Sequence, residues 1–231
     1  MSRTLVSLAA LLLVCATTFG QDQPYAQVTY AKGQEAKLIA VLKSDAPQKD
    51  KADACRLLAI VGTKEAVAPL AALLDDEKLA HMARYGLEPN PDPSVNVALR
   101  DSLGKVKGLH LVGVIGSLGV RKDATAVEPI AKLLCDKECV VKQAAARALG
   151  KIGTPEAAKA IDGALAGVDE CCKLAFCEGL LRAAENLAAC GQKDAAIALC
   201  DKLCKESVPA QVKLGAAKRA RMLRQQPGKG L

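Results

Sequence analysis

The side chains with the clearest capacity for chemistry are cysteines, of which the 231-residue chain has 10. Their thiols can form disulfides, bind a metal ion or act as nucleophiles, and clustering in an exported protein favours disulfides. Cys55 stands alone in the first half of the chain after residue 20, and we expect it to be a buried free thiol. The disulfide candidates all lie after residue 134, and they are Cys135, Cys139, Cys171, Cys172, Cys177, Cys190, Cys200 and Cys204.

The positions of these cysteines favour some pairings over others. Cys135 and Cys139 flank the junction of two expected helices, so a bond between them is a natural pairing. Cys139 and Cys171 hold equivalent positions in neighbouring repeats, and stacked helices lie about 8–10 Å apart, which is beyond bridging range. A second class of bond would join the last two repeats, through Cys172 or Cys177 and Cys200 or Cys204.

Metal binding is the alternative use of the thiols. Cys135 and Cys139 lie one helical turn apart, as do Cys200 and Cys204, and four thiolates can hold zinc tetrahedrally. The usual Cys-x-x-Cys spacing is absent and no histidine lies nearby in the sequence. We therefore expect no metal and no other cofactor, with a thiol-rich metal-binding protein as an alternative.

Catalytic motifs are also absent from the sequence. The two histidines, His81 and His110, belong to no His-Glu-x-x-His motif, and the chain has neither a Gly-x-Ser-x-Gly motif nor a glycine-rich phosphate loop. The sequence thus predicts a protein that is not an enzyme.

Residues 1–20 have the pattern of a secretory leader. Arg3 supplies the positive charge, an apolar run covers 5–14, and cleavage after Gly20 satisfies the small-residue rule. The run is too short to cross a bilayer of about 30 Å, and no later stretch is apolar enough. We expect export to the periplasm or the cell exterior; a lipid anchor at Cys15 is an alternative, disfavoured by the bulky residue before it.

Beyond the leader the sequence repeats itself. Residues 55–66 and 146–157 are nearly alike, and apolar residues recur at i, i+3, i+4 and i+7, which is typical of a helix with one buried face. The expected helix pairs are 33–43 with 48–61, 64–75 with 78–88, 94–106 with 109–118, 124–135 with 138–152, 155–166 with 170–189, and 194–206 with 209–223. Such pairs cannot bury their apolar faces alone, so they predict an all-α, right-handed α-solenoid of about six helix pairs.

The expected organisation has four segments: the leader at 1–20, an N-terminal extension at 21–32, the solenoid at 33–224 and a flexible basic tail at 225–231.

Two motifs carry a family resemblance. Ala-Val-x-Pro-Leu/Ile-Ala-x-Leu-Leu occurs at 66–74 and 126–134, and Ala-Ala-x-x-Ala-Leu-Gly-x-Ile-Gly occurs at 144–153. They resemble the HEAT and armadillo-like repeats, in particular the PBS-lyase HEAT-like type, here in an exported bacterial form. The resemblance implies a scaffold for protein–protein interaction. It leaves open an accessory subunit of an enzyme or cofactor-attachment system, as in the bilin lyases.

The expected binding surface is a concave face lined by the second helix of each pair. Its candidate contact residues share exposed positions on those helices or on the proline-rich loop 89–93, and they are Arg56, His81, Arg84, Tyr85, Pro91, Lys142 and Arg147. Residues 207–231 carry six basic side chains and no acid, which fits a solvated cap at the end of a repeat array. An anionic surface that binds the basic C-terminal helix is the alternative. Nucleic acid is disfavoured, because no aromatic residues interleave with the basic ones.

Overall fold

The structure is a computed structural model that describes residues 33–206 and 208–225. Within these residues it contains twelve α-helices, two 3₁₀ helices and no strand. The α-helices are α1 (Gln34–Lys43), α2 (Gln48–Val61), α3 (Lys64–Ala71), α4 (Ala80–Leu87), α5 (Ser94–Ser102), α6 (Gly108–Val120), α7 (Val127–Lys132), α8 (Cys139–Ile152), α9 (Pro155–Leu165), α10 (Glu170–Ala189), α11 (Lys193–Lys205) and α12 (Ala210–Gln225). The six expected helix pairs are therefore present.

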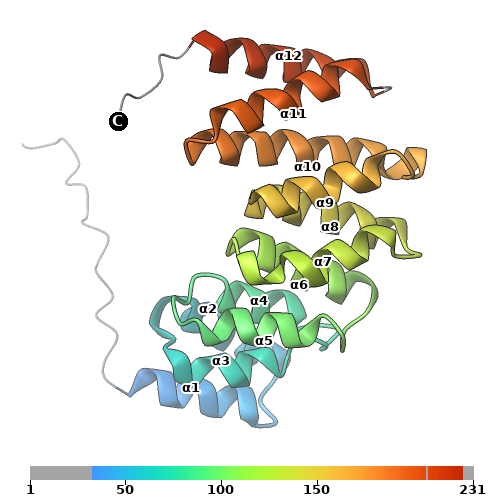
Figure 1. The fold of residues 1–231 in the computed structure, drawn as a ribbon. Coiled ribbons are helices and arrows are strands. Elements are labelled where there is room, and N and C mark those ends of the chain that lie inside the picture. Colours follow the sequence, from blue (N-terminus) through green and yellow to red (C-terminus); the bar gives the residue numbers. More distant parts are fainter. Residues whose placement is uncertain (1–32, 207, 226–231) are drawn as a thin grey trace, which may run out of the picture. The chain divides into compact units, whose positions relative to one another are not determined.

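The helix pairs stack in two layers (Figure 1). The second helices of the pairs contact one another in succession, from α2 through α4, α6, α8 and α10 to α12. The first helices lie beside them, and α1 contacts α3, α3 contacts α5, and α7 contacts α9. A continuous core of mainly alanine, leucine, valine and isoleucine fills the space between the layers, with Phe176 as its largest fully buried side chain. Each pair buries its apolar face against its neighbours, which is the arrangement of an α-solenoid.

Two first helices are shorter than expected. The expected helix 64–75 ends at Ala71, and the expected helix 124–135 is divided into η1 (Ala124–Ala126), α7 and η2 (Leu133–Cys135). Both segments contain a proline, Pro69 and Pro129, which lacks an N–H group and whose ring clashes with the carbonyl four residues earlier. This mechanism accounts for the break between η1 and α7 at Pro129, whereas Pro69 lies inside α3, two residues before that helix ends.

Two asparagines, Asn90 and Asn186, cap the C-terminal ends of second helices from the next repeat. Asn90, only 3% exposed, donates through Nδ2 to the carbonyl oxygens of Gly62 (3.2 Å) and Thr63 (2.9 Å) after α2. Asn186 on α10 donates in the same way to Gly150 (2.9 Å) and Lys151 (3.1 Å) near the end of α8. Carbonyls at a helix C-terminus lack partners within the helix, so these contacts satisfy them and fix the spacing of neighbouring repeats.

Arg121 holds the proline-rich loop that follows α4. Its Nη1 atom donates to the carbonyl oxygens of Glu88 (2.8 Å) and Asn90 (2.6 Å), and its Nε atom donates to the Asn96 side chain. Pro91 itself is exposed on this loop. The loop is thus anchored to the end of α6 rather than free at the surface.

Small residues let the second helices approach closely. A Cβ atom added at Gly179 would lie 2.5 Å from the carbonyl oxygen of Ala146, and one added at Gly150 would lie 2.4 Å from that of Gly179. Between α6 and α8, a Cβ at Gly119 would lie 2.9 Å from the Cα of Ala148. The backbones of neighbouring second helices are therefore in direct contact.

Several predicted segments lie outside the described residues: the leader at 1–20 with Cys15, the extension at 21–32, and residues 226–231 of the basic tail. Within 33–206 and 208–225, no helix has the length and apolar character that crossing a bilayer requires.

Candidate functional site

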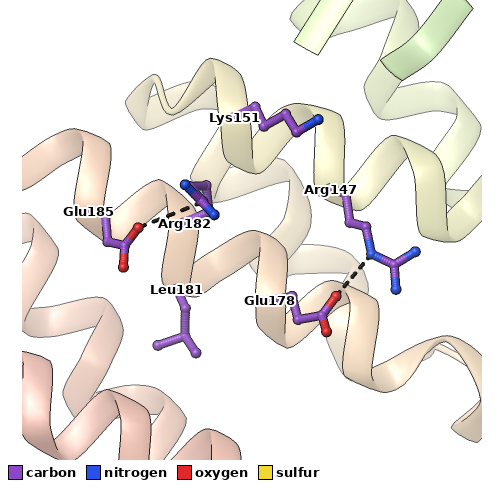
Figure 2. Close-up of a pocket in the computed structure, with 6 residues that line it drawn as sticks. All are labelled: Arg147, Lys151, Glu178, Leu181, Arg182 and Glu185. Carbon is purple, nitrogen blue, oxygen red and sulfur yellow. Dashed lines mark hydrogen bonds and ion pairs between the residues drawn. The ribbon is translucent and has the colours of Figure 1, made fainter. Parts of the chain in front are cut away.

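The outward surface of α8, α10 and α12, here called the second-helix face, contains two adjoining hollows. The first has a volume of about 390 Å³ and is lined by Arg147 and Lys151 from α8 and by Glu178, Leu181, Arg182 and Glu185 from α10 (Figure 2). The second, of about 410 Å³, is lined by Leu181, Glu185, Gly215, Lys218, Arg219 and Met222. Because Leu181 and Glu185 line both, the two hollows lie side by side across three helices, and together they are here called the groove.

More basic than acidic side chains line this groove. Arg147 Nε lies 2.9 Å from Glu178 Oε2, and Arg182 Nε lies 3.7 Å from the Glu185 carboxylate, which also accepts a hydrogen bond from Arg219. Lys151 and Lys218 form no ion pair within the described residues. Five basic side chains thus face two acidic ones, and the groove carries a positive charge.

Apolar side chains accompany the charges on the same surface. Leu214 and Met222 on α12 are 74% and 47% exposed, and Leu174 on α10 is 40% exposed. A protein contact surface combines apolar anchors with a polar border, and this face offers both. A separate hollow of about 460 Å³ lies between α7 and α9 in the other layer; its charged lining residues, Glu128 and Glu156, are both acidic.

Of the seven residues expected to bind a partner, Arg147 lies in the groove. Arg56 on α2 is exposed and paired with Asp53 at 2.9 Å. On α4, His81 Nδ1 lies 3.5 Å from Arg84 Nη2, and Tyr85 is 50% exposed.

Arg84 is a packing residue more than a surface residue. Its Nη1 atom lies 3.5 Å from the carbonyl oxygen of Gly113, and an added Cβ at Gly113 would lie 2.5 Å from the guanidinium. Its Nε atom is buried without a partner among the described residues, and burial lowers the pKa of Arg84. Gly113 thereby makes room for this side chain between α4 and α6.

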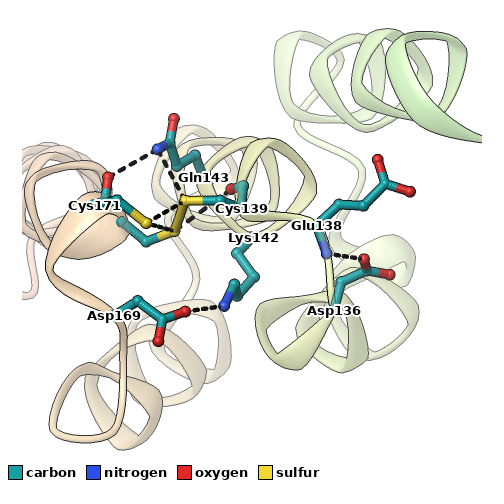
Figure 3. Close-up of a disulfide and its surroundings, with 8 residues drawn as sticks. Asp136, Glu138, Cys139, Lys142, Gln143, Asp169 and Cys171 are labelled. Atoms are coloured by element: carbon teal, nitrogen blue, oxygen red, sulfur yellow. Dashed lines mark hydrogen bonds and ion pairs between the residues drawn. A yellow bond between two sulfur atoms is a disulfide. The ribbon is translucent and has the colours of Figure 1, made fainter.

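Lys142 belongs to a different region, at the start of α8. It forms an ion pair with Asp169, and this hydrogen bond raises the pKa of Lys142. Beside it lie three cysteines (Figure 3). Cys139 is bonded to Cys172 with a Cα–Cα distance of 6.2 Å, and the sulfur of Cys171 lies 2.7 Å from that of Cys139.

The disulfide corrects the pairings expected from the sequence. Cys139 bonds across to the next repeat, so the predicted bond to Cys135 is wrong, as is the expectation that positions at Cys139 and Cys171 lie beyond bridging range. The expected 8–10 Å applies to helix axes, whereas Cys139 and Cys172 face each other at the ends of α8 and α10, which the contacts at Gly150 and Gly179 hold close. Among the described cysteines the remaining candidates are free thiols: Cys135, Cys171, Cys177, Cys190, Cys200 and Cys204.

Three of the free thiols lie in the core. Two of them, Cys177 and Cys200, belong to the predicted bonds between the last two repeats, which are not formed among the described cysteines. Cys177 and Cys200 are buried, and Cys55 is buried as well, in agreement with the sequence. Burial raises the pKa of Cys55 and of Cys200 to about 11, and it raises the pKa of Cys177. These thiols stay protonated at neutral pH and act as small apolar side chains.

The match to one family model agrees with this architecture. Residues 87–181 match the family model of HEAT repeats. The crystal structure of an engineered protein is similar at 20% sequence identity and a TM-score of 0.46, over 82% of this chain and 96% of that chain. No curated protein sequence matches this chain significantly. Residues 87–181 of this α-solenoid are therefore similar to HEAT repeats.

Proposed function

We propose that this protein is an exported, non-catalytic scaffold that binds another protein through the second-helix face. HEAT repeats generally mediate protein–protein interaction, and the similarity to them supports a protein as the partner. The observation that carries the proposal is the groove of two adjoining hollows on α8, α10 and α12, where exposed apolar side chains adjoin an excess of basic ones. Stacked second helices give such a groove a fixed spacing, which suits an extended or helical segment of a partner.

The charge of the groove indicates an acidic partner segment. Lys151 and Lys218 have no ion pair within the described part of the chain, so an incoming carboxylate competes with no existing contact there. The pairs at Arg147 and Arg182 are exposed, and exposed ion pairs contribute little stability, so their arginines can be drawn to a partner at low cost. Leu181 and Met222 would contact apolar side chains of the same segment.

A non-catalytic role is supported by the positions of the histidines. His81 lies beside Arg84, and the His110 ring lies 3.3 Å from the Asp75 carboxylate. Neither lines the groove. An accessory subunit that holds a cofactor for an enzyme, as the bilin-lyase resemblance implies, would instead carry a bound small molecule when purified from its host.

Export is proposed from the leader-like pattern of residues 1–20, with Arg3 before an apolar run. We expect the protein purified from its own host to have an intact mass that begins at Gln21. An intact mass that begins at Met1 would contradict export, and an added mass of lipid on Cys15 would instead favour an anchored form.

The groove is tested with a triple variant. We expect Arg147→Ala, Lys151→Ala and Lys218→Ala together to weaken recovery of the host partner about tenfold, since each lost charge pair contributes about 0.5–1 kcal/mol. The matched control removes three exposed lysines from the first-helix layer, at Lys132, Lys159 and Lys205. Recovery is measured by crosslinking in the host and quantitative mass spectrometry.

The control shows whether the loss of partner depends on where the three positive charges are removed, and not only on the change in net charge. The triple variant should lose the partner and the first-layer variant should retain it, with both variants matching the native protein in helicity. Equal recovery with the two variants would contradict the assignment of the groove as the binding surface.

A further inference from the structure

Three sulfur atoms converge at the N-terminal ends of the neighbouring helices α8 and α10 (Figure 3). Cys139 is the first residue of α8, and Cys171 and Cys172 lie in the first turn of α10. The Cys171 sulfur lies 2.7 Å from that of Cys139 and 3.6 Å from that of Cys172, and all three lie within 4.8 Å of one another. The proposed scaffold function makes no use of this cluster.

The arrangement of the sulfurs separates two kinds of chemistry. A thiolate that attacks a disulfide approaches along the axis of the S–S bond, so the three sulfurs must lie nearly in a line. With a bond of about 2.05 Å, a collinear approach at 2.7 Å from Cys139 would place Cys171 about 4.7 Å from the Cys172 sulfur. The observed 3.6 Å makes a triangle instead. A triangle of sulfurs is how three thiolates surround a common metal ion.

The surroundings of the triangle favour negative charge on the sulfurs. All three cysteines lie at helix N-termini, where the backbone N–H groups carry partial positive charge. The ammonium group of Lys142 lies close by, on its ion pair with Asp169. Gln143 Nε2 donates to the Cys139 sulfur at 3.4 Å and to the Cys171 carbonyl oxygen at 2.9 Å, which orients both cysteines. Polar partners of this kind fix the ligands of a metal site.

We propose that, once the disulfide is reduced, Cys139, Cys171 and Cys172 bind one Zn²⁺ ion as three thiolates. Zinc–sulfur bonds of about 2.3 Å put tetrahedral ligands about 3.8 Å apart, close to the 3.6 Å between the Cys171 and Cys172 sulfurs. Breaking the disulfide frees the Cys139 sulfur to move out to the same separation. Cys171 is exposed, so a water molecule can reach the fourth position. Zinc is a borderline-soft ion that thiolates bind well.

The disulfide and zinc states exclude each other, because a bonded sulfur has no thiolate to offer. A phosphine reductant supplies the two electrons that break the S–S bond; it becomes a phosphine oxide, with oxygen from water, and the two hydrogen atoms of the water complete the two thiols. Zinc then displaces up to three thiol protons, which pass to the solvent.

The test titrates Zn²⁺ against a chromophoric chelator, with the full chain held in a phosphine reductant under argon. We expect the reduced protein to bind one Zn²⁺ per chain and the oxidised protein to bind none at this site. Cys171→Ser should weaken binding about tenfold or more, because it removes a ligand. Cys190→Ser is the matched control, since Cys190 is an exposed free cysteine at the other end of α10, and its affinity should equal that of the native chain.

Alkylation of the reduced protein of native sequence, with and without zinc, tests the same site without a variant. Bound zinc should protect Cys139, Cys171 and Cys172 from labelling, while exposed Cys135 and Cys190 are labelled. No zinc binding by the reduced protein, equal affinity of the Cys171→Ser variant and the native chain, or no protection of the three cysteines would overturn the proposal. A Cys139–Cys171 bond that replaces the Cys139–Cys172 bond on standing, with no zinc uptake after reduction, would assign the cluster to thiol exchange instead.

Discussion

Replacing Gly179 with valine should lower the free energy of unfolding by about 3 kcal/mol, because overpacking against a rigid neighbour costs about 1–3 kcal/mol or more. A Cβ at this position would lie 2.5 Å from the carbonyl oxygen of Ala146, which is backbone and cannot move aside as a flexible side chain would. The two methyl groups of valine add to this clash. The α8 and α10 helices must separate to admit them, and their separation also opens the core around Phe176.

Urea unfolding followed by circular dichroism measures this effect. The control is Gly163→Ala on α9, where a Cβ would meet nothing within 4 Å. That change should leave stability equal or raise it by up to about 1 kcal/mol, because alanine favours the helix over glycine. Equal stability of the Gly179→Val variant and the native chain would mean that α8 and α10 are not in backbone contact.

The second large effect is expected at Arg121. Changing it to alanine removes the donor to the carbonyl oxygens of Glu88 and Asn90, and leaves the loop after α4 without its anchor to α6. Hydrogen bonds to a charged group contribute about 1.5–3 kcal/mol, so the free energy of unfolding should fall by about 2 kcal/mol.

Hydrogen exchange distinguishes local release of the loop from destabilisation of the whole fold. Amides of the loop between α4 and α5 should exchange faster in the Arg121→Ala variant, whereas those of α8 should not change. Arg56→Ala serves as the control, because Arg56 is an exposed arginine with one ion pair within its own helix and should contribute less than about 0.5 kcal/mol. If the two variants lost the same stability, Arg121 would have no anchoring role.

The fold could be predicted because the helices of each repeat are determined by residues that lie close together in the sequence. The apolar spacing of Val127, Ile130 and Leu134 and the cap at Thr154 depend on residues within one or two turns, and the structure keeps them: Ile130 is buried and Thr154 accepts from the amide of Ala157. The contacts that set the distance between repeats depend on residues about 30 positions apart. The capping role of Asn90 and Asn186 could not be predicted from the sequence, because each binds the end of a helix that is distant along the chain.

The candidate groove was only partly visible in the sequence. Arg147 was singled out as an arginine on a second helix, and it lies in the groove. Lys151 lies four residues later on the same helix face, and Glu178 and Arg182 have the same spacing on α10, so a comparison of charges at i and i+4 on second helices would have found them. The thiol cluster was missed for another reason: its closeness follows from the backbone contact at Gly150 and Gly179, which sequence spacing does not give.

One side of the groove is formed by α12, which is the last helix of the described stack. Gly215, Lys218, Arg219 and Met222 all come from α12, whose pair with α11 has a stacked neighbour on one side only within the described residues. End units of a repeat array open more easily than internal ones, since half of their interface is missing. Under the proposed function, a partner that spans α10 and α12 would add contacts across their junction and hold α12 in place. Its apparent affinity would then be set in part by the fraction of molecules in which α12 is already docked.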